Sequence, residues 1–138
     1  MLLAAMLAAA DPGLRTPASE SSAAAAVAVV RRYYAAIDAR DYRTAYRLWP
    51  GRYSFAQMKA GYATTAHVRV VPIPPFAVEG AAGSLYCEVP VEVEAVQRNG
   101  RHQRFRGQFT LRRVNDVDGS TVAQRRWHIA SAKLKQVG

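Results

Sequence analysis

Three titratable side chains, His67, Asp38 and Asp41, occupy positions that could support acid–base chemistry. An imidazole titrates near neutral pH, so His67 could act as a general base. The simpler expectation is a structural or exposed histidine. Asp38 and Asp41 could form an acidic pair, but they flank a predicted turn between two helices. Because Asp side chains cap backbone N–H groups at such turns, we interpret both as caps.

Two other histidines and the single cysteine indicate neither a metal site nor a nucleophile. His102 and His128 have outward-facing positions in the predicted strands and belong to no HxH or HExxH motif. Cys87 stands alone, which excludes an intramolecular disulfide, a CxxC pair and a multi-cysteine zinc site. It lies on the inward row of its predicted strand with Val and Leu, and a thiol buried among apolar side chains is a poor nucleophile. We expect no metal and no cofactor.

Aromatic side chains form a more suggestive set, because eight of them should converge between the predicted helices and the sheet. Several tyrosine hydroxyls cannot all be buried without partners, so some should lie at a wetted cavity wall or at the protein surface. Apolar walls with a few polar groups are typical of small-molecule pockets. Arg113, at the inward-facing end of a strand, could attract a ligand carboxylate at the pocket mouth, or could equally be an exposed strand-end arginine. The predicted ligand-binding residues are Tyr34, Tyr46, Trp49, Phe55, Tyr62, His67, Phe109, Arg113 and Trp127.

Three amphipathic helices are predicted in the first half of the chain. The spacing of apolar residues places them over residues 22–39, 41–49 and 54–63. Asp41 can cap the second helix, and Pro50 with Gly51 ends it. Ser54 and Gln57 have the spacing of a capping box, which predicts the start of the third helix.

After Thr64 the period of the apolar residues changes from 3.6 to 2, which predicts a sheet. The first strand begins at His67–Val70, and the prolines that follow restrict it to a sheet edge. Two long strands cover Leu85–Ala95 and Arg104–Val114. A last strand, Gln124–Leu134, should direct Trp127 and Ile129 toward the core.

The turn between the two long strands decides which side chains face the core. Asn99-Gly100 suggests a two-residue hairpin loop, but that register would mix apolar and charged side chains on both faces. A three-residue loop, Arg98–Gly100 with a left-handed Gly100, pairs Val93 with Phe105 and Glu94 with Arg104. We therefore predict an apolar inner face and a solvated outer face of Glu and Arg rows.

Length and charge narrow the class of protein. The chain has 138 residues, enough for one domain, which we assign to residues 22–138. Its 19 basic and 10 acidic residues give a net charge of +9, but only three of the basic residues are lysines. This arginine-rich and alanine-rich composition is typical of a GC-rich genome. Because the Arg-Arg pairs are scattered over different elements, we predict no nucleic-acid partner.

The first ten residues carry no polar side chain. This run is too short to span a bilayer, and Ala8-Ala9-Ala10 before Asp11 matches the cleavage pattern of a secretory signal. No basic residue precedes the run, so a frayed terminus is the alternative. We predict a signal-like segment with a linker over residues 1–21, and a periplasmic or secreted protein, otherwise a cytoplasmic one.

Three motifs in order resemble the nuclear transport factor 2-like superfamily: the aromatic stretch of residues 33–42, the helix Ala45–Trp49 and the closing Trp127-His-Ile129 strand. The resemblance implies an α+β cone, with three N-terminal helices packed on a curved antiparallel sheet and a pocket at the wide end. Enzymes of this superfamily mostly place a carboxylate, often with Tyr or His, on the pocket side. The inward rows of the two long strands carry no acid here.

We interpret the chain as a non-catalytic domain of the bacterial cell envelope or periplasm that binds a small, partly apolar ligand or a partner protein. The alternative is an isomerase, dehydratase or cyclase that acts on a hydrophobic substrate, with His67 and Tyr62 in place of the missing carboxylate. No membrane span is expected. A homodimer through the outer sheet face is compatible with this fold, although the charged rows argue against a large dry interface.

Overall fold

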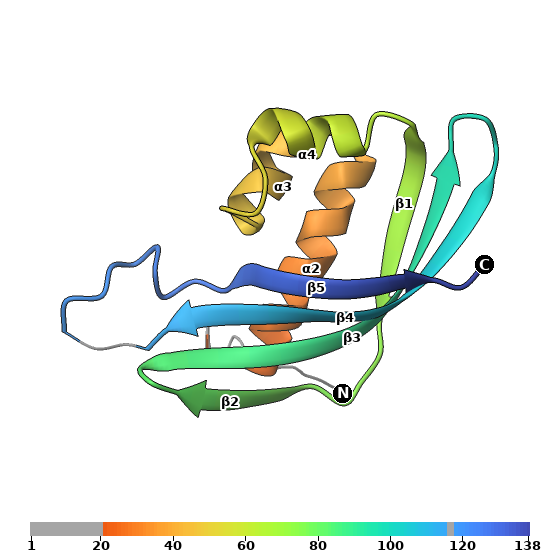
Figure 1. The fold of residues 1–138 in the computed structure, drawn as a ribbon. Helices are drawn as coiled ribbons and strands as arrows, with labels where there is room; N and C mark the ends of the chain where they lie inside the picture. Colours follow the sequence, from red (N-terminus) through yellow and green to blue (C-terminus); the bar gives the residue numbers. More distant parts are fainter. Residues whose placement is uncertain (1–20, 116–117) are drawn as a thin grey trace, which may run out of the picture.

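Three helices cover one face of a curved five-stranded antiparallel sheet in the computed structural model, which describes residues 21–115 and 118–138 (Figure 1). The helices are α2 (Ala23–Asp38), α3 (Tyr42–Leu48) and α4 (Phe55–Gly61). The strands are β1 (Thr65–Pro72), β2 (Ala77–Ala81), β3 (Ser84–Gln97), β4 (His102–Val114) and β5 (His128–Gln136). This is the predicted α+β architecture. The predicted signal-like segment lies outside the described residues.

Two of the three helices begin at the predicted caps, Asp41 and Ser54, and Ser22, expected as the first residue of its helix, caps that helix instead. The side chain of Ser22 accepts a hydrogen bond from the backbone N–H of Ala25 at 3.1 Å. Asp41 accepts one from the N–H of Thr44 at 3.3 Å, and Ser54 with Gln57 forms the complete capping box. Each cap satisfies a backbone donor that the first helical turn leaves without a partner.

Asp38 does not cap a helix, so that prediction is wrong. Its Oδ1 accepts a hydrogen bond from the backbone N–H of Val68 at 2.9 Å and lies 3.3 Å from Nδ1 of His67. The carboxylate therefore ties the end of α2 to β1. This long-range contact replaces the expected local one.

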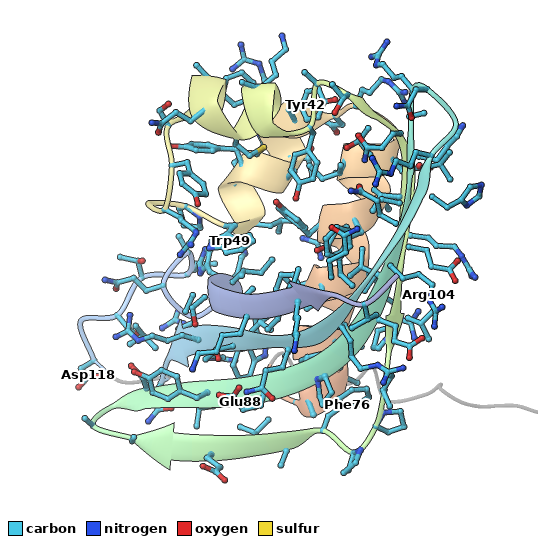
Figure 2. The ribbon with its side chains drawn as sticks, turned by 45° about the vertical axis from the view of Figure 1, so that its right-hand side comes forward. Tyr42, Trp49, Phe76, Glu88, Arg104 and Asp118 are labelled. Atoms are coloured by element: carbon cyan, nitrogen blue, oxygen red, sulfur yellow. The ribbon has the colours of Figure 1, made fainter. Side chains whose placement is uncertain are left out.

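The hairpin of β3 and β4 has the predicted three-residue loop and register. Val93 pairs with Phe105, Glu94 pairs with Arg104, and Gly100 has a left-handed φ of 86°. The inner side chains of β3 are buried, namely Cys87, Val89, Val91, Val93 and Ala95. On the outer face Glu94 binds Arg69 and Glu92 binds Arg106, at 2.9 and 2.6 Å. Figure 2 labels Glu88 and Arg104 of these strands.

The edge position of β1 is confirmed, since β3 is the one strand of the described residues that pairs with β1. The short strand β2 was not predicted. It pairs with the beginning of β3 through a turn in which Ala82 and Gly83 have φ values of 51° and 82°. The segment has one β-branched residue, and its turn lacks the Asn-Gly or Asp-Gly pattern. The sequence therefore contains no signal that would have predicted a strand here.

The last strand begins at His128, not at Gln124 as predicted. Gln124 donates its backbone N–H to the Thr121 hydroxyl at 3.1 Å, and its side-chain oxygen accepts from the N–H of Thr121 at 2.8 Å. This is the reciprocal pattern of a capping box, and the spacing of Thr and Gln could have predicted a helical turn. Trp127 and Ile129 are buried as expected, with exposures of 4% and 2%.

Gly107 in the interior of β4 permits a close approach of β5. A Cβ atom added there would overlap the carbonyl oxygen of Lys133 and lie 2.8 Å from its carbonyl carbon. Both obstacles are backbone atoms, which cannot rotate away. A glycine inside a strand often marks such an approach, and here it maintains the β4–β5 pairing that forms one wall of the fold.

We predict that Gly107→Ala lowers the free energy of unfolding by roughly 3 kcal/mol, because β5 must move away from β4. Gly61→Ala is the matched control, since a Cβ there meets nothing within 4 Å. Its stability should be unchanged or slightly higher, because Ala favours the helix. Urea denaturation measures both. A Gly107→Ala protein as stable as the wild type would contradict the packing described.

Candidate functional site

An aromatic cavity of about 540 Å³ opens between the helices and β5. Residues from α2, from α3, from the segment between α3 and β1, and from β5 contribute to it, and Figure 2 shows Trp49 between α3 and β5. Its aromatic walls are Tyr33, Tyr34, Tyr46, Trp49, Tyr53 and Tyr62. The remaining lining residues are Arg52, Gln57, Met58, Gly61, Ala132 and Leu134.

The aromatic walls are fixed by edge-to-face ring contacts. Tyr33 lies 5.6 Å from Trp49 between ring centroids, and Trp49 lies 5.7 Å from Phe109. Phe109 is fully buried and also contacts Tyr34 at 5.8 Å. Each such pair contributes about 0.5–1.5 kcal/mol beyond the burial of its area. The rings therefore form a preorganised wall, with Phe109 of the sheet beneath them.

A pair of phenols supplies the main polar feature of the cavity. The hydroxyls of Tyr33 on α2 and Tyr62 at the end of α4 lie 2.9 Å apart. Burial raises the pKa of Tyr33 well above its usual value, and the neighbouring Tyr62 raises it further. Burial also raises the pKa of Tyr62, although its hydrogen bond with Tyr33 opposes this. Both groups are protonated at neutral pH, so one hydroxyl donates to the other and the accepting hydroxyl retains a proton for a further acceptor.

Arg52 is the one charged side chain among the described residues that line the cavity. Its guanidinium lies 5.8 Å from the Trp49 ring and 5.1 Å from the Tyr53 ring, within the range of cation–π contact. These contacts hold an exposed cation beside the aromatic wall. The indole N–H of Trp49 is buried and has no acceptor among the described residues. The cavity thus offers several donors but no acidic group.

The structure brings together four of the predicted ligand-binding residues, Tyr34, Tyr46, Trp49 and Tyr62. Two others lie directly behind them. Phe55 contacts the ring of Tyr46 at 5.8 Å, and Phe109 lies beneath Tyr34 and Trp49. His67, Arg113 and Trp127 do not line this cavity.

Arg113 is neither at the cavity mouth nor exposed, so both predicted positions are wrong. Its side chain is 3% exposed, and its Nε donates to the carbonyl oxygen of Val114 at 3.3 Å. The cation beside the cavity is Arg52, in the segment between α3 and α4. That segment has no periodic pattern, so only its nearness to Trp49 could have drawn attention to Arg52.

His67 lies apart from the aromatic cavity. Its side chain is 73% exposed, and it lines a shallow depression with Asp38, Glu94 and His102. The structure therefore does not bring His67 and Tyr62 together in one cavity. Trp127 lines a second groove, beside α2 and α3.

A β-bulge explains why the lining residues of β5 were missed. The β4–β5 register shifts between Thr110 and Leu111, so that Thr110 pairs with Ser131 and Leu111 with Ile129. The extra residue reverses the alternation after Ile129, which brings Ala132 and Leu134 to the cavity. The other missed lining residues are Tyr33, Arg52, Tyr53, Gln57, Met58 and Gly61. The helical spacing of Tyr33 and Met58 could have included them.

The remaining titratable candidates show no reactive arrangement. Cys87 is buried, and burial raises the pKa of its thiol, which disfavours the thiolate. Burial lowers the pKa of His128. Across residues 21–115 and 118–138, no three His, Cys, Asp or Glu side chains are grouped to hold a metal ion. None of the helices in these ranges has the length and hydropathy needed to cross a membrane.

No model of a known protein family and no curated protein matches the sequence. Solved structures do resemble the fold. A protein of Novosphingobium aromaticivorans, provisionally assigned as an aromatic ring hydroxylase, aligns with a TM-score of 0.62 and 14% identity, over 89% of this chain and 96% of that one. A provisionally assigned scytalone dehydratase of the same organism gives a TM-score of 0.60 and 12% identity, over 83% and 84%.

A nuclear transport factor 2-like superfamily protein of Salmonella enterica aligns with a TM-score of 0.55 and 16% identity, over 78% of this chain and 85% of that one. At such identities the similarity shows the fold alone. The chain has the nuclear transport factor 2-like fold that its motifs predicted, with the aromatic cavity between the helices and the sheet.

We predict that the free energy of unfolding falls as the pH rises above about 10, the ordinary pKa of tyrosine. Burial raises the pKa values of Tyr33, Tyr34 and Tyr62 in the folded state. Below pH 10 both states keep these protons, whereas above it only the unfolded state loses them, which favours unfolding. Alkaline titration of phenolate absorbance, over the seven tyrosines of the chain, should show a fraction that ionises only as the protein unfolds. Ionisation of all seven in a folded protein would contradict this.

Proposed function

We propose that the aromatic cavity binds a small, partly apolar molecule that carries a ring and a hydrogen-bond acceptor, without converting it. The observation that carries the proposal is the Tyr33–Tyr62 hydroxyl pair, 2.9 Å apart, within walls formed by aromatic rings. The rings provide dispersion and burial, and the remaining phenol proton orients one polar atom of the ligand. A volume of about 540 Å³ suits a molecule of one or two rings.

The second candidate function is a dehydratase-type or isomerase-type enzyme, and the name of the scytalone dehydratase neighbour favours the dehydratase. Such a reaction needs a group that takes up a proton near neutral pH. The described residues that line the cavity include no carboxylate, imidazole or thiol. The tyrosines do not replace them, because burial raises the pKa values of Tyr33 and Tyr62 and keeps both protonated. We therefore favour binding over catalysis.

We predict that Gly61→Leu lowers the affinity for 2-acetylnaphthalene, a ring ketone, by about tenfold, the loss expected when a few methylene-sized contacts are displaced. Gly61 lines the cavity, and a Cβ there meets nothing within 4 Å, so the new side chain occupies ligand space without strain. The substitution is introduced into a Trp127→Phe protein, the background protein, in which Trp49 is the single tryptophan. The fluorescence of Trp49 then reports binding.

Ala60→Leu is the matched control. Ala60 precedes Gly61 on α4, is exposed and does not line the cavity. The Ala60→Leu substitution adds the same side chain outside the site, so the affinity of this variant for 2-acetylnaphthalene should equal that of the background protein. Equal weakening by both substitutions would contradict the proposed site. Conversion of this or related ring ketones, followed by chromatography, would contradict the proposal that the cavity only binds.

A further inference from the structure

A second groove, of about 690 Å³, lies beside α2, the end of α3 and the segment that precedes β5. In Figure 1, α3 and the segment that precedes β5 lie on the same side of α2. Three arginines from three different segments line the groove: Arg32 of α2, Arg47 of α3 and Arg126. Its apolar surface includes Val29, Leu48 and Trp127. The groove therefore combines cations with a hydrophobic floor.

None of the three arginines forms a close ion pair within the part of the chain that the structure describes. The described lining of the groove contains no Asp or Glu. The ion pairs found among the described residues are His67–Asp38, Arg69–Glu94 and Arg106–Glu92, none of which involves these arginines. Arg47 donates to the hydroxyl of Thr44 at 3.3 Å, and its charge also acts on the carboxylate of Asp41, which does not line the groove. Like charges that converge on a concave surface raise the local positive potential and attract anions.

A buried donor in the same groove supports this interpretation independently of charge. Trp127 is only 4% exposed, and its indole N–H is buried without an acceptor among the described residues. A buried unpaired donor costs about 1–3 kcal/mol, so such groups need an explanation. Neighbouring His128 adds a polar group to the groove, and burial together with the charge of Arg126 lowers its pKa. An acceptor bound in the groove would lie beside both Trp127 and Arg126, which line it.

We propose that this groove binds a small organic phosphate, with the phosphoryl group among the three guanidiniums and the organic group on the apolar floor. A phosphate monoester carries nearly two negative charges at neutral pH and has three acceptor oxygens. Planar guanidinium groups bind such oxygens in pairs. A monocarboxylate would leave most of the positive charge uncompensated, and inorganic phosphate would leave the apolar floor uncovered. The site is separate from the aromatic cavity and does not depend on its function.

Isothermal titration calorimetry with phenyl phosphate, phenyl sulfate and inorganic phosphate, at physiological ionic strength, tests the proposal on the full chain. Phenyl phosphate should bind, and each of the other two probes should bind about fivefold or more weakly, because the sulfate has one charge and inorganic phosphate has no ring. Arg32→Gln, Arg47→Gln and Arg126→Gln should each weaken phenyl phosphate binding about tenfold, the effect of a lost charged hydrogen bond.

Arg31→Gln is the matched control. Arg31 is the exposed neighbour of Arg32 on α2 and does not line the groove, so its loss removes the same charge elsewhere. It should change the affinity by less than about twofold, as expected for screened exposed charges. Phenyl phosphate should also shift the indole N–H resonance of Trp127. Equal weakening by Arg31→Gln and Arg32→Gln, equal affinity for phenyl phosphate and inorganic phosphate, or no binding at millimolar concentration would overturn the proposal.

Discussion

The register between β3 and β4 is the constraint on which the chemistry of the aromatic cavity depends. The three-residue loop ending at Gly100 pairs Val93 with Phe105 and directs both toward the helices. A slip of one residue would turn Glu88, Glu92 and Glu94 toward the helical layer and expose the valines. Because the register holds, the acids of β3 lie on the outer face, where Glu92 and Glu94 bind arginines. The sheet behind the cavity is consequently apolar, and phenols from the helical layer are the main polar groups of the cavity.

The helices and the segment between α3 and α4 supply the two main polar features of the cavity. Tyr33 and Tyr62 come from helices far apart in sequence and meet through their hydroxyls, and Arg52 lies against the rings of Trp49 and Tyr53. Burial keeps the phenols neutral, so they act as hydrogen-bond donors rather than bases. Structural neighbours with enzyme names share the fold, but one fold hosts many functions. The side chains that line the cavity are therefore the basis for choosing between binding and catalysis.

Local patterns predicted much of the structure, and long-range contacts account for what they missed. The caps Asp41 and Ser54 and the alternation of β3 and β4 depend on neighbouring residues or on one hairpin, and all were predicted. The bulge in β5, the contact of Asp38 with Val68 and the burial of Arg113 depend on tertiary packing, which sequence periodicity does not contain. Export, a single domain over residues 22–138 and dimerisation stay predictions from the sequence.

Nuclear magnetic resonance of the two tryptophan indole groups tests the central claim most directly. Trp49 lines the aromatic cavity, whereas Trp127 lies in the second groove, and each gives a separate indole N–H resonance. Addition of 2-acetylnaphthalene should shift the Trp49 resonance in a saturable way, leave that of Trp127 in place and leave the ketone chemically unchanged. A shift of the Trp127 resonance alone, or no saturable shift of either, would contradict the account of an aromatic binding cavity.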